Sequence, residues 1–187
     1  GKICVGFTPD EEIGRGAAHF DVKNFGADFA YTIDGGIEGE ISYENFNASA
    51  AEIEIHGVSV HPGSAKNTMI NAVNVGIELN GMLPSCEKPE HTEGYEGFYY
   101  LESFNGNTDY AKMSYILRDH DNSKLEAKKA TLLLAEKLIN EKYGEGTVKI
   151  TISDQYKNMA EHVKPCMHLI DNAISAMKAL NVTPIIE

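Results

Sequence analysis

The sequence predicts an α/β part interrupted by an inserted α+β domain with the element order β-α-β-β-α-β, a ferredoxin-like arrangement. Apolar runs at 3–8 and 29–33 show no polar alternation, which is typical of strands buried on both faces of a parallel sheet. Residues 51–56, in contrast, alternate strictly between apolar and polar, as in a strand with one exposed face. We therefore predict three segments, with the α/β part at 1–47 and 156–187 and the inserted domain at 48–155.

The segment between the two apolar runs has the length of a helix, which favours a short strand-helix-strand crossover. Within the inserted domain, the first helix is predicted over 67–83, where apolar residues recur every three or four positions. Pro84 ends it. Its expected buried face comprises Met69, Ala72, Gly76, Leu79 and Leu83.

Two strands are predicted next, at 97–104 and 110–118. They flank Asn105-Gly106-Asn107, and an Asn-Gly pair tolerates the positive φ of a hairpin turn. The two strands are therefore expected to pair antiparallel.

The second helix of the inserted domain is expected to begin at Ser123, which forms a capping-box pattern with Glu126, and to end near Gly144. Its predicted buried face comprises Ala127, Ala130, Leu134 and Leu138. Alternation at Val148, Ile150 and Ile152 indicates a fourth strand. Two helices would then cover one face of a four-stranded antiparallel sheet.

A last helix is predicted from Pro165 onward, with Leu169, Ala173, Met177 and Leu180 on one face. Residues 183–186 then indicate the start of a strand. The chain begins without Met and stops as this strand begins, so we expect a piece cut from a longer protein at both ends.

Composition excludes several classes of function. With 187 residues, a net charge of -12 and a pI near 5.0, the chain lacks the basic cluster that nucleic acid or an anionic membrane requires. Cys4, Cys86 and Cys166 form no CxxC pair, so neither a disulfide framework nor a thiolate zinc site is indicated. No apolar leader or run of about 18 apolar residues occurs. We therefore expect a cytoplasmic protein without nucleic-acid or membrane partners.

Acidic residues follow both predicted buried strands. Asp10, Glu11 and Glu12 come after the first and Asp34 after the second, and ligands of parallel sheets bind at these carboxyl ends. Carboxylates gathered there repel one another unless a cation or protons compensate, which favours a metal site for zinc, magnesium or calcium. Alternatively, they form an acidic loop at a helix start, where carboxylates favour the helix dipole. The residue types alone leave both interpretations open.

Four motifs resemble the peptidase T family of tripeptide aminopeptidases, which use two co-catalytic zinc ions. The motifs are FTPDEEIG at 7–14, YTIDGG at 31–36, VHPGSAK at 60–66 and TEGYEGFY at 92–99. The resemblance implies that Glu11 is the general base, that Glu12 binds one zinc ion and that Asp34 binds the other. In such a site, the metals lower the pKa of a shared water and the free carboxylate takes its proton.

The resemblance also implies that His61 reaches the active site of the partner subunit, where it stabilises the oxyanion and contacts the substrate. It assigns Arg118 to the substrate's carboxylate, which a planar guanidinium binds in bidentate fashion. The residues themselves allow simpler roles. His61 could be a turn histidine before Pro62, and Arg118 could form a salt bridge to Asp119 or Asp121.

The other histidines match no motif of the family, and we expect them to be surface or core residues: His19, His56, His91, His120, His162 and His168. The aromatic cluster is expected to serve strand packing or an interface rather than substrate contact: Tyr95, Phe98, Tyr99 and Tyr100.

The family's remaining metal ligands have no counterpart here, since its His-x-Asp segment, bridging Asp and late His are all missing. We therefore expect that the parent is a zinc aminopeptidase acting on tripeptides, that it forms a homodimer through residues 48–155, the lid domain, and that this chain alone is inactive. The alternative is a dimerisation or small-ligand-binding module without catalysis. A magnesium-dependent phosphoryl-transfer enzyme is a third class, and it lacks its phosphate-binding glycine loop.

Overall fold

The structure, a computed structural model, describes residues 2–10, 12, 15–17 and 19–186. It consists of two compact units, Gly1–Glu38 and Gly39–Glu187, which are described separately. None of the described helices combines the length and apolar character that a membrane span needs.

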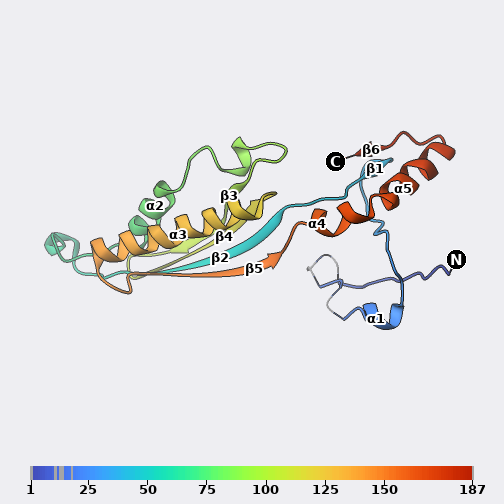
Figure 1. Cartoon of the computed structure of the whole chain (residues 1–187). Helices are drawn as coiled ribbons and strands as arrows, with labels where there is room; N and C mark the ends of the chain where they lie inside the picture. Colours follow the sequence, from blue (N-terminus) through green and yellow to red (C-terminus); the bar gives the residue numbers. More distant parts are fainter. Residues whose placement is uncertain (1, 11, 13–14, 18, 187) are drawn as a thin grey trace. The chain divides into compact units, whose positions relative to one another are not determined.

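The larger unit contains a four-stranded sheet with the strand order β3-β4-β2-β5. All neighbouring strands are antiparallel. Figure 1 shows helices α2 and α3 on the same face of this sheet, so the other face carries no helix. The elements occur in the order that the sequence predicts for 48–155: β2 (Asn47–His56), α2 (Ala72–Met82), β3 (Phe98–Gly106), β4 (Tyr110–Asp119), α3 (Asn122–Tyr143) and β5 (Val148–Tyr156).

The hydrophobic core lies between the sheet and the two helices. In β2, Ile53 and Ile55 are fully buried while Glu52 and Glu54 between them remain accessible, which confirms the predicted alternation. Each buried aliphatic side chain contributes about 1.5–3 kcal/mol to folding. The core also includes Val75, Leu79, Leu83, Tyr99, Ala111, Met113, Tyr115, Leu117, Leu125, Leu132, Ala135, Ile139 and Val148.

Helix α2 begins five residues later than predicted, and Met69 is therefore not part of it. The side chain of Asn71 accepts hydrogen bonds from the backbone N–H groups of Val73, at 3.0 Å, and Asn74, at 3.2 Å, so it fixes the first turn. Gly76 allows a close approach to the sheet, because a Cβ there would lie 2.6 Å from the Phe104 ring.

Helix α3 was predicted correctly in extent but wrongly in its cap and buried face. Asp121, not Ser123, caps it by accepting hydrogen bonds from the backbone N–H groups of Ser123 and Lys124 at 2.7 and 3.1 Å. The predicted face is accessible to solvent, with Leu134 55% and Leu138 44% exposed. The residues that pack inward are Leu125, Lys128, Leu132, Ala135 and Ile139.

The β3–β4 hairpin forms as predicted, but its turn lies two residues further along. Asn105 and Gly106 still belong to β3, and the connection is made by residues 107–109. Asn107 Oδ1 accepts hydrogen bonds from the backbone N–H groups of Asp109, at 2.9 Å, and Tyr110, at 3.1 Å. A side-chain turn therefore takes the place of the expected Asn-Gly turn.

The rest of the larger unit includes a short parallel pair between β1 (Glu40–Ile41) and β6 (Ile185–Ile186), so the strand indicated after residue 183 is confirmed. The predicted last helix is α5 (His168–Ala179), which begins three residues after Pro165. It follows α4 (Ala160–Val163) and one 3-10 turn.

The smaller unit contains one short helix, α1 (Val22–Phe25), among its described residues. The strands predicted at 3–8 and 29–33 are not formed. An apolar run becomes a buried strand only where neighbouring strands accept its backbone hydrogen bonds and other layers cover both faces. Here Phe7 is 92% and Ile33 94% exposed, so neither run has such surroundings.

Candidate functional site

Arg118 lies near the end of β4 on the sheet face opposite α2 and α3, and His120 is the first residue after β4. Side chains alternate along an extended segment, and Asp119 between them is buried on the opposite face, 2% exposed. In the ladder, Arg118 stands across from Phe98 of β3 and Ala48 of β2. Arg118 Nε and His120 Nδ1 are both buried, and neither has a hydrogen-bond partner among the described residues. Buried polar atoms are nearly always paired, so two unpaired ones at one place indicate a binding site.

Aromatic rings connect the two residues into one cluster. The His120 ring lies 4.2 Å from the Phe46 ring and 4.4 Å from the Tyr95 ring. The Phe46 ring in turn lies 5.6 Å from that of Phe98, the residue opposite Arg118. We call these five residues the open-face cluster: Phe46, Tyr95, Phe98, Arg118 and His120.

Tyr95 is held in place by Glu44. Its hydroxyl donates a hydrogen bond of 2.5 Å to Glu44 Oε1, and this bond raises the pKa of Tyr95. The Glu44 carboxylate is thereby engaged by a neutral donor.

The simpler role for Arg118 is wrong, because no ion pair joins it to Asp119 or Asp121 in the part of the chain that the structure describes. Asp121 serves as the cap of α3, and the hydrogen bond from the Ser123 hydroxyl is the main cause that lowers its pKa. Asp119 faces Lys128, with 3.6 Å between Oδ2 and Nζ. Neither acid neutralises the guanidinium.

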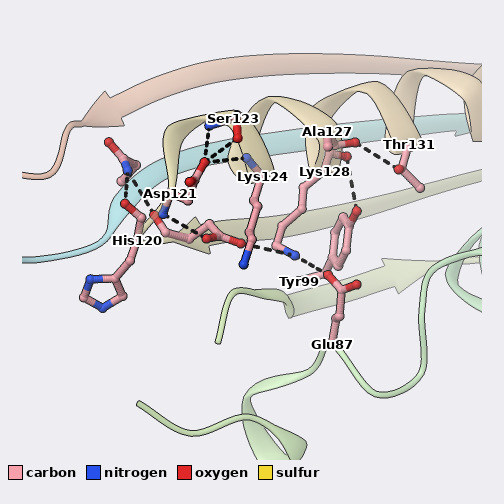
Figure 2. A network of polar contacts seen from close by, with 11 residues as sticks. Glu87, Tyr99, His120, Asp121, Ser123, Lys124, Ala127, Lys128 and Thr131 are labelled. Carbon is pink, nitrogen blue, oxygen red and sulfur yellow. Dashed lines mark hydrogen bonds and ion pairs between the residues drawn. The ribbon is translucent and has the colours of Figure 1, made fainter. Parts of the chain in front are cut away.

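Behind the cluster lies a buried ion-pair network, shown in Figure 2. The Lys128 ammonium pairs with Glu87 and Asp119 and lies 5.1 Å from the centre of the Tyr99 ring. Burial raises the pKa of Tyr99, whose hydroxyl donates to the Lys128 carbonyl. Because Glu87 lies in the connection 83–97, which also carries Tyr95, the network links this connection to α3. Gly97 is required at its end, since a Cβ there would collide with the Asp119 carboxylate.

Three asparagines fasten the chain segments that lead into and out of the lid domain. Asn47 Nδ2 donates to the carbonyls of Asp119 and His120 at 3.1 and 2.9 Å. The backbone N–H of Asn158 donates to Asn47 Oδ1 at 2.9 Å, and that of Asn45 donates to Asn158 Oδ1 at 3.2 Å. These hydrogen bonds thus fix the backbone next to Arg118 and at His120 to the segments that enter and leave the lid domain. No motif in the sequence indicated this arrangement.

His61 lies in the loop after β2 and is exposed. Its Nδ1 accepts a hydrogen bond of 3.1 Å from the Gly63 backbone N–H, so it caps the 3-10 turn Pro62–Ser64. An accepting Nδ1 requires the proton of the neutral ring to be on Nε2. His61 can therefore cap the turn through Nδ1 and still donate a hydrogen bond through Nε2–H, because the bond from Gly63 fixes this tautomer.

The residues implied as general base and metal ligands lie in the smaller unit. Glu11 lies outside the described residues. Glu12 and Asp34 are exposed, and Asp34 Oδ1 accepts a 2.8 Å hydrogen bond from the Gly35 N–H. Among the described residues, no group of three His, Cys, Asp or Glu side chains could hold a metal ion. Two carboxylates are fewer than the three protein ligands of a catalytic zinc ion.

The remaining aromatic residues divide between core and surface. Tyr99 is buried in the network, whereas Tyr100 is 42% exposed. His56 lies at the opposite end of β2, where its ring is 5.4 Å from that of Tyr110. His120 is a candidate site residue that the sequence analysis did not select. The available signal was its place two positions after Arg118 at a strand end, which puts both on one face.

Comparison with known proteins identifies a domain family and similar peptidases. The sequence profile of the M20 peptidase dimerisation domain matches residues 43–147. Peptidase T of Clostridium novyi is 54% identical over 184 residues, which cover 98% of this chain and 45% of that protein.

Two solved structures share the fold. One is the aminopeptidase PepT from Bacillus cereus, with a TM-score of 0.78 at 21% identity. The other is a tripeptidase from Staphylococcus aureus, with a TM-score of 0.80 at 18% identity. Each comparison covers 96% of this chain and 48% of the other, so the chain spans about half the length of the proteins it matches.

Proposed function

Because this chain belongs to the M20 peptidase dimerisation-domain family and is similar to peptidase T over 98% of its length, we propose that it is part of a zinc-dependent tripeptidase. The parent protein would release the N-terminal residue of a tripeptide and act in the cytoplasm. The observation that carries the proposal is the half-buried Arg118 side chain, whose Nε is buried and has no hydrogen-bond partner among the described residues, on the sheet face opposite α2 and α3. A short peptide with a free carboxylate supplies the missing acceptor.

Each implied site residue has a distinct role in this proposal. Glu12 and Asp34 would each provide an oxygen ligand to one of two zinc ions, which when bound lower the pKa of a water molecule. Glu11 would take the proton of that water and pass it to the leaving amine. The other ligands would come from outside these 187 residues, so we propose that the chain alone is inactive.

The lid domain, 48–155, with its ferredoxin-like order of elements, would contribute two further residues. His61 would donate its Nε2–H to the oxyanion of the tetrahedral intermediate in the partner subunit. Arg118 would bind the C-terminal carboxylate of the substrate. Since this carboxylate lies at the end of a tripeptide, the distance from Arg118 to the metal site would select substrates of three residues.

The proposal is tested by the release of alanine from trialanine by a full-length protein that carries this chain. We expect activity that disappears on chelation and returns with zinc. Glu11→Gln should lower kcat by about 10²–10⁴-fold, because the proton acceptor is lost. The 187-residue chain should release no alanine. Full activity of the Glu11→Gln protein at unchanged zinc content would rule the mechanism out.

Dimerisation is a second function favoured by a specific observation. Helix α3 presents an exposed apolar stripe beside the edge strand β5. Monomeric proteins rarely expose such a stripe, and an edge strand offers unpaired backbone groups to another chain. We propose that a homodimer forms through this stripe, which comprises Ala130, Leu133, Leu134 and Leu138.

Leu134→Glu should therefore weaken self-association of the chain by about 100-fold, because a charge would be buried in the interface. Sedimentation equilibrium measures the change. Ile77→Glu is the matched control, since Ile77 is equally exposed, 58%, on the other helix. It should leave the dimer intact. A Leu134→Glu chain with wild-type association would show that α3 is not the interface.

A further inference from the structure

We propose that His120 is a second carboxylate-binding group, which together with Arg118 holds the C-terminal carboxylate of a peptide. The inference rests on the proposed function for its substrate class and extends it by a residue that no family motif marks. Arg118 offers Nε–H and His120 offers Nδ1, and both atoms are buried without a partner on the same face. A carboxylate has two oxygens, so one anion would supply an acceptor to each group.

The His120 ring is held in a fixed position. Rings from two other segments flank it, Phe46 at 4.2 Å and Tyr95 at 4.4 Å. Its backbone carbonyl accepts hydrogen bonds from the side-chain amides of Asn47, at 2.9 Å, and Asn158, at 3.4 Å. Figure 2 shows the imidazole pointing away from the ion-pair network around Lys128. A ring held in this way provides a preformed donor rather than a mobile surface group.

The positive charge of Arg118 favours an anion at the cluster. Asp119 turns toward Lys128, and Asp121 caps α3. Glu44 accepts the hydroxyl of Tyr95. Among the described residues, no ion pair engages the guanidinium of Arg118, so a carboxylate can bind it through a charge-assisted hydrogen bond. This arrangement would require His120 to carry its proton on Nδ1, the opposite tautomer from His61.

The test is a titration of the ¹⁵N-labelled 187-residue chain with trialanine, followed by NMR of the histidine ring nitrogens and the Arg118 Nε–H. We expect the His120 Nδ1 signal and the Arg118 Nε–H signal to shift with the same dissociation constant, about millimolar. Trialanine amide, which lacks the carboxylate, should shift neither. His56, at the opposite end of β2, should stay unchanged and serves as the internal control.

His120→Asn should weaken trialanine binding about tenfold, the loss of one charge-assisted hydrogen bond, while His56→Asn leaves it unchanged. His120→Gln provides a second variant should the first fail to fold. An Arg118 response without a His120 response would overturn the inference and leave the proposed function standing. Equal responses to the acid and the amide would also overturn it. Hydrolysis of trialanine by the full-length protein tests the proposed function separately.

Discussion

Replacing Lys128 with methionine is expected to lower the free energy of unfolding of this chain by about 3–5 kcal/mol. Methionine fills a similar volume but leaves Asp119 buried, 2% exposed, with no cation beside it. It also releases Glu87, so the connection that carries Tyr95 loses its tie to α3. Urea denaturation of the purified chain, followed by circular dichroism, measures the loss.

Lys129→Met is the matched control for this experiment. Lys129 is the next residue on the same helix and pairs with Glu126 and Asp154, whose side chains are 57% and 63% exposed. Ion pairs with such exposed partners contribute less than about 1 kcal/mol. Equal losses for the two variants would show that the Lys128 network does not hold the domain together.

His61→Ala in the full-length protein is expected to lower kcat for trialanine by about 10²–10³-fold, with little change in KM. The reason is that the Nε2–H would meet negative charge only when the tetrahedral intermediate forms. The Nδ1 bond to Gly63 holds the ring in the donating tautomer beforehand. Steady-state kinetics on matched zinc-loaded preparations measures both constants.

The control for His61 is His91→Ala, because His91 also belongs to a 3-10 turn with a proline at its start and is exposed. It should keep the wild-type kcat. His61→Asn, which retains a donor, should recover part of the activity. Loss through KM alone would mean that His61 only binds the substrate and does not stabilise the oxyanion.

Strict patterns in the sequence predicted the lid domain well, because its strands have one buried face. Alternation at Ile53 and Ile55 identified β2 without ambiguity. Helix α3 shows the limit of this approach. Its buried face contains Lys128, which interrupts the apolar pattern in the sequence. The face through Leu134 and Leu138, in contrast, has an uninterrupted apolar pattern. Only the tertiary position of Asp119 and Glu87 explains why a lysine points inward.

Strands in the smaller unit could not be predicted from apolar content alone. The runs at 3–8 and 29–33 have the composition of buried strands, but a strand also needs neighbours that the local sequence does not encode. No strand is assigned to either run. Glu12 and Asp34, whose predicted positions depended on those strand ends, are correspondingly exposed.

The candidate site was predicted in part. The family resemblance identified His61 and Arg118 as candidates, but nothing in the sequence showed that Phe46 and Tyr95 flank His120. Residues 46, 95 and 120 come from three separate connections, and only the folded sheet brings them together. The hydrogen bond between Asn158 and Asn47 could not be predicted from the sequence for the same reason.

We propose that the lid domain recognises the substrate's carboxylate and does not serve for dimerisation alone. The most direct test is the ratio of kcat/KM for trialanine to that for trialanine amide, measured on the full-length protein and on its Arg118→Ala variant. We expect a ratio of about 100 for the wild type, which falls to about ten in the variant, where His120 still contacts the carboxylate. An unchanged ratio would mean that the carboxylate is bound elsewhere and would contradict the account.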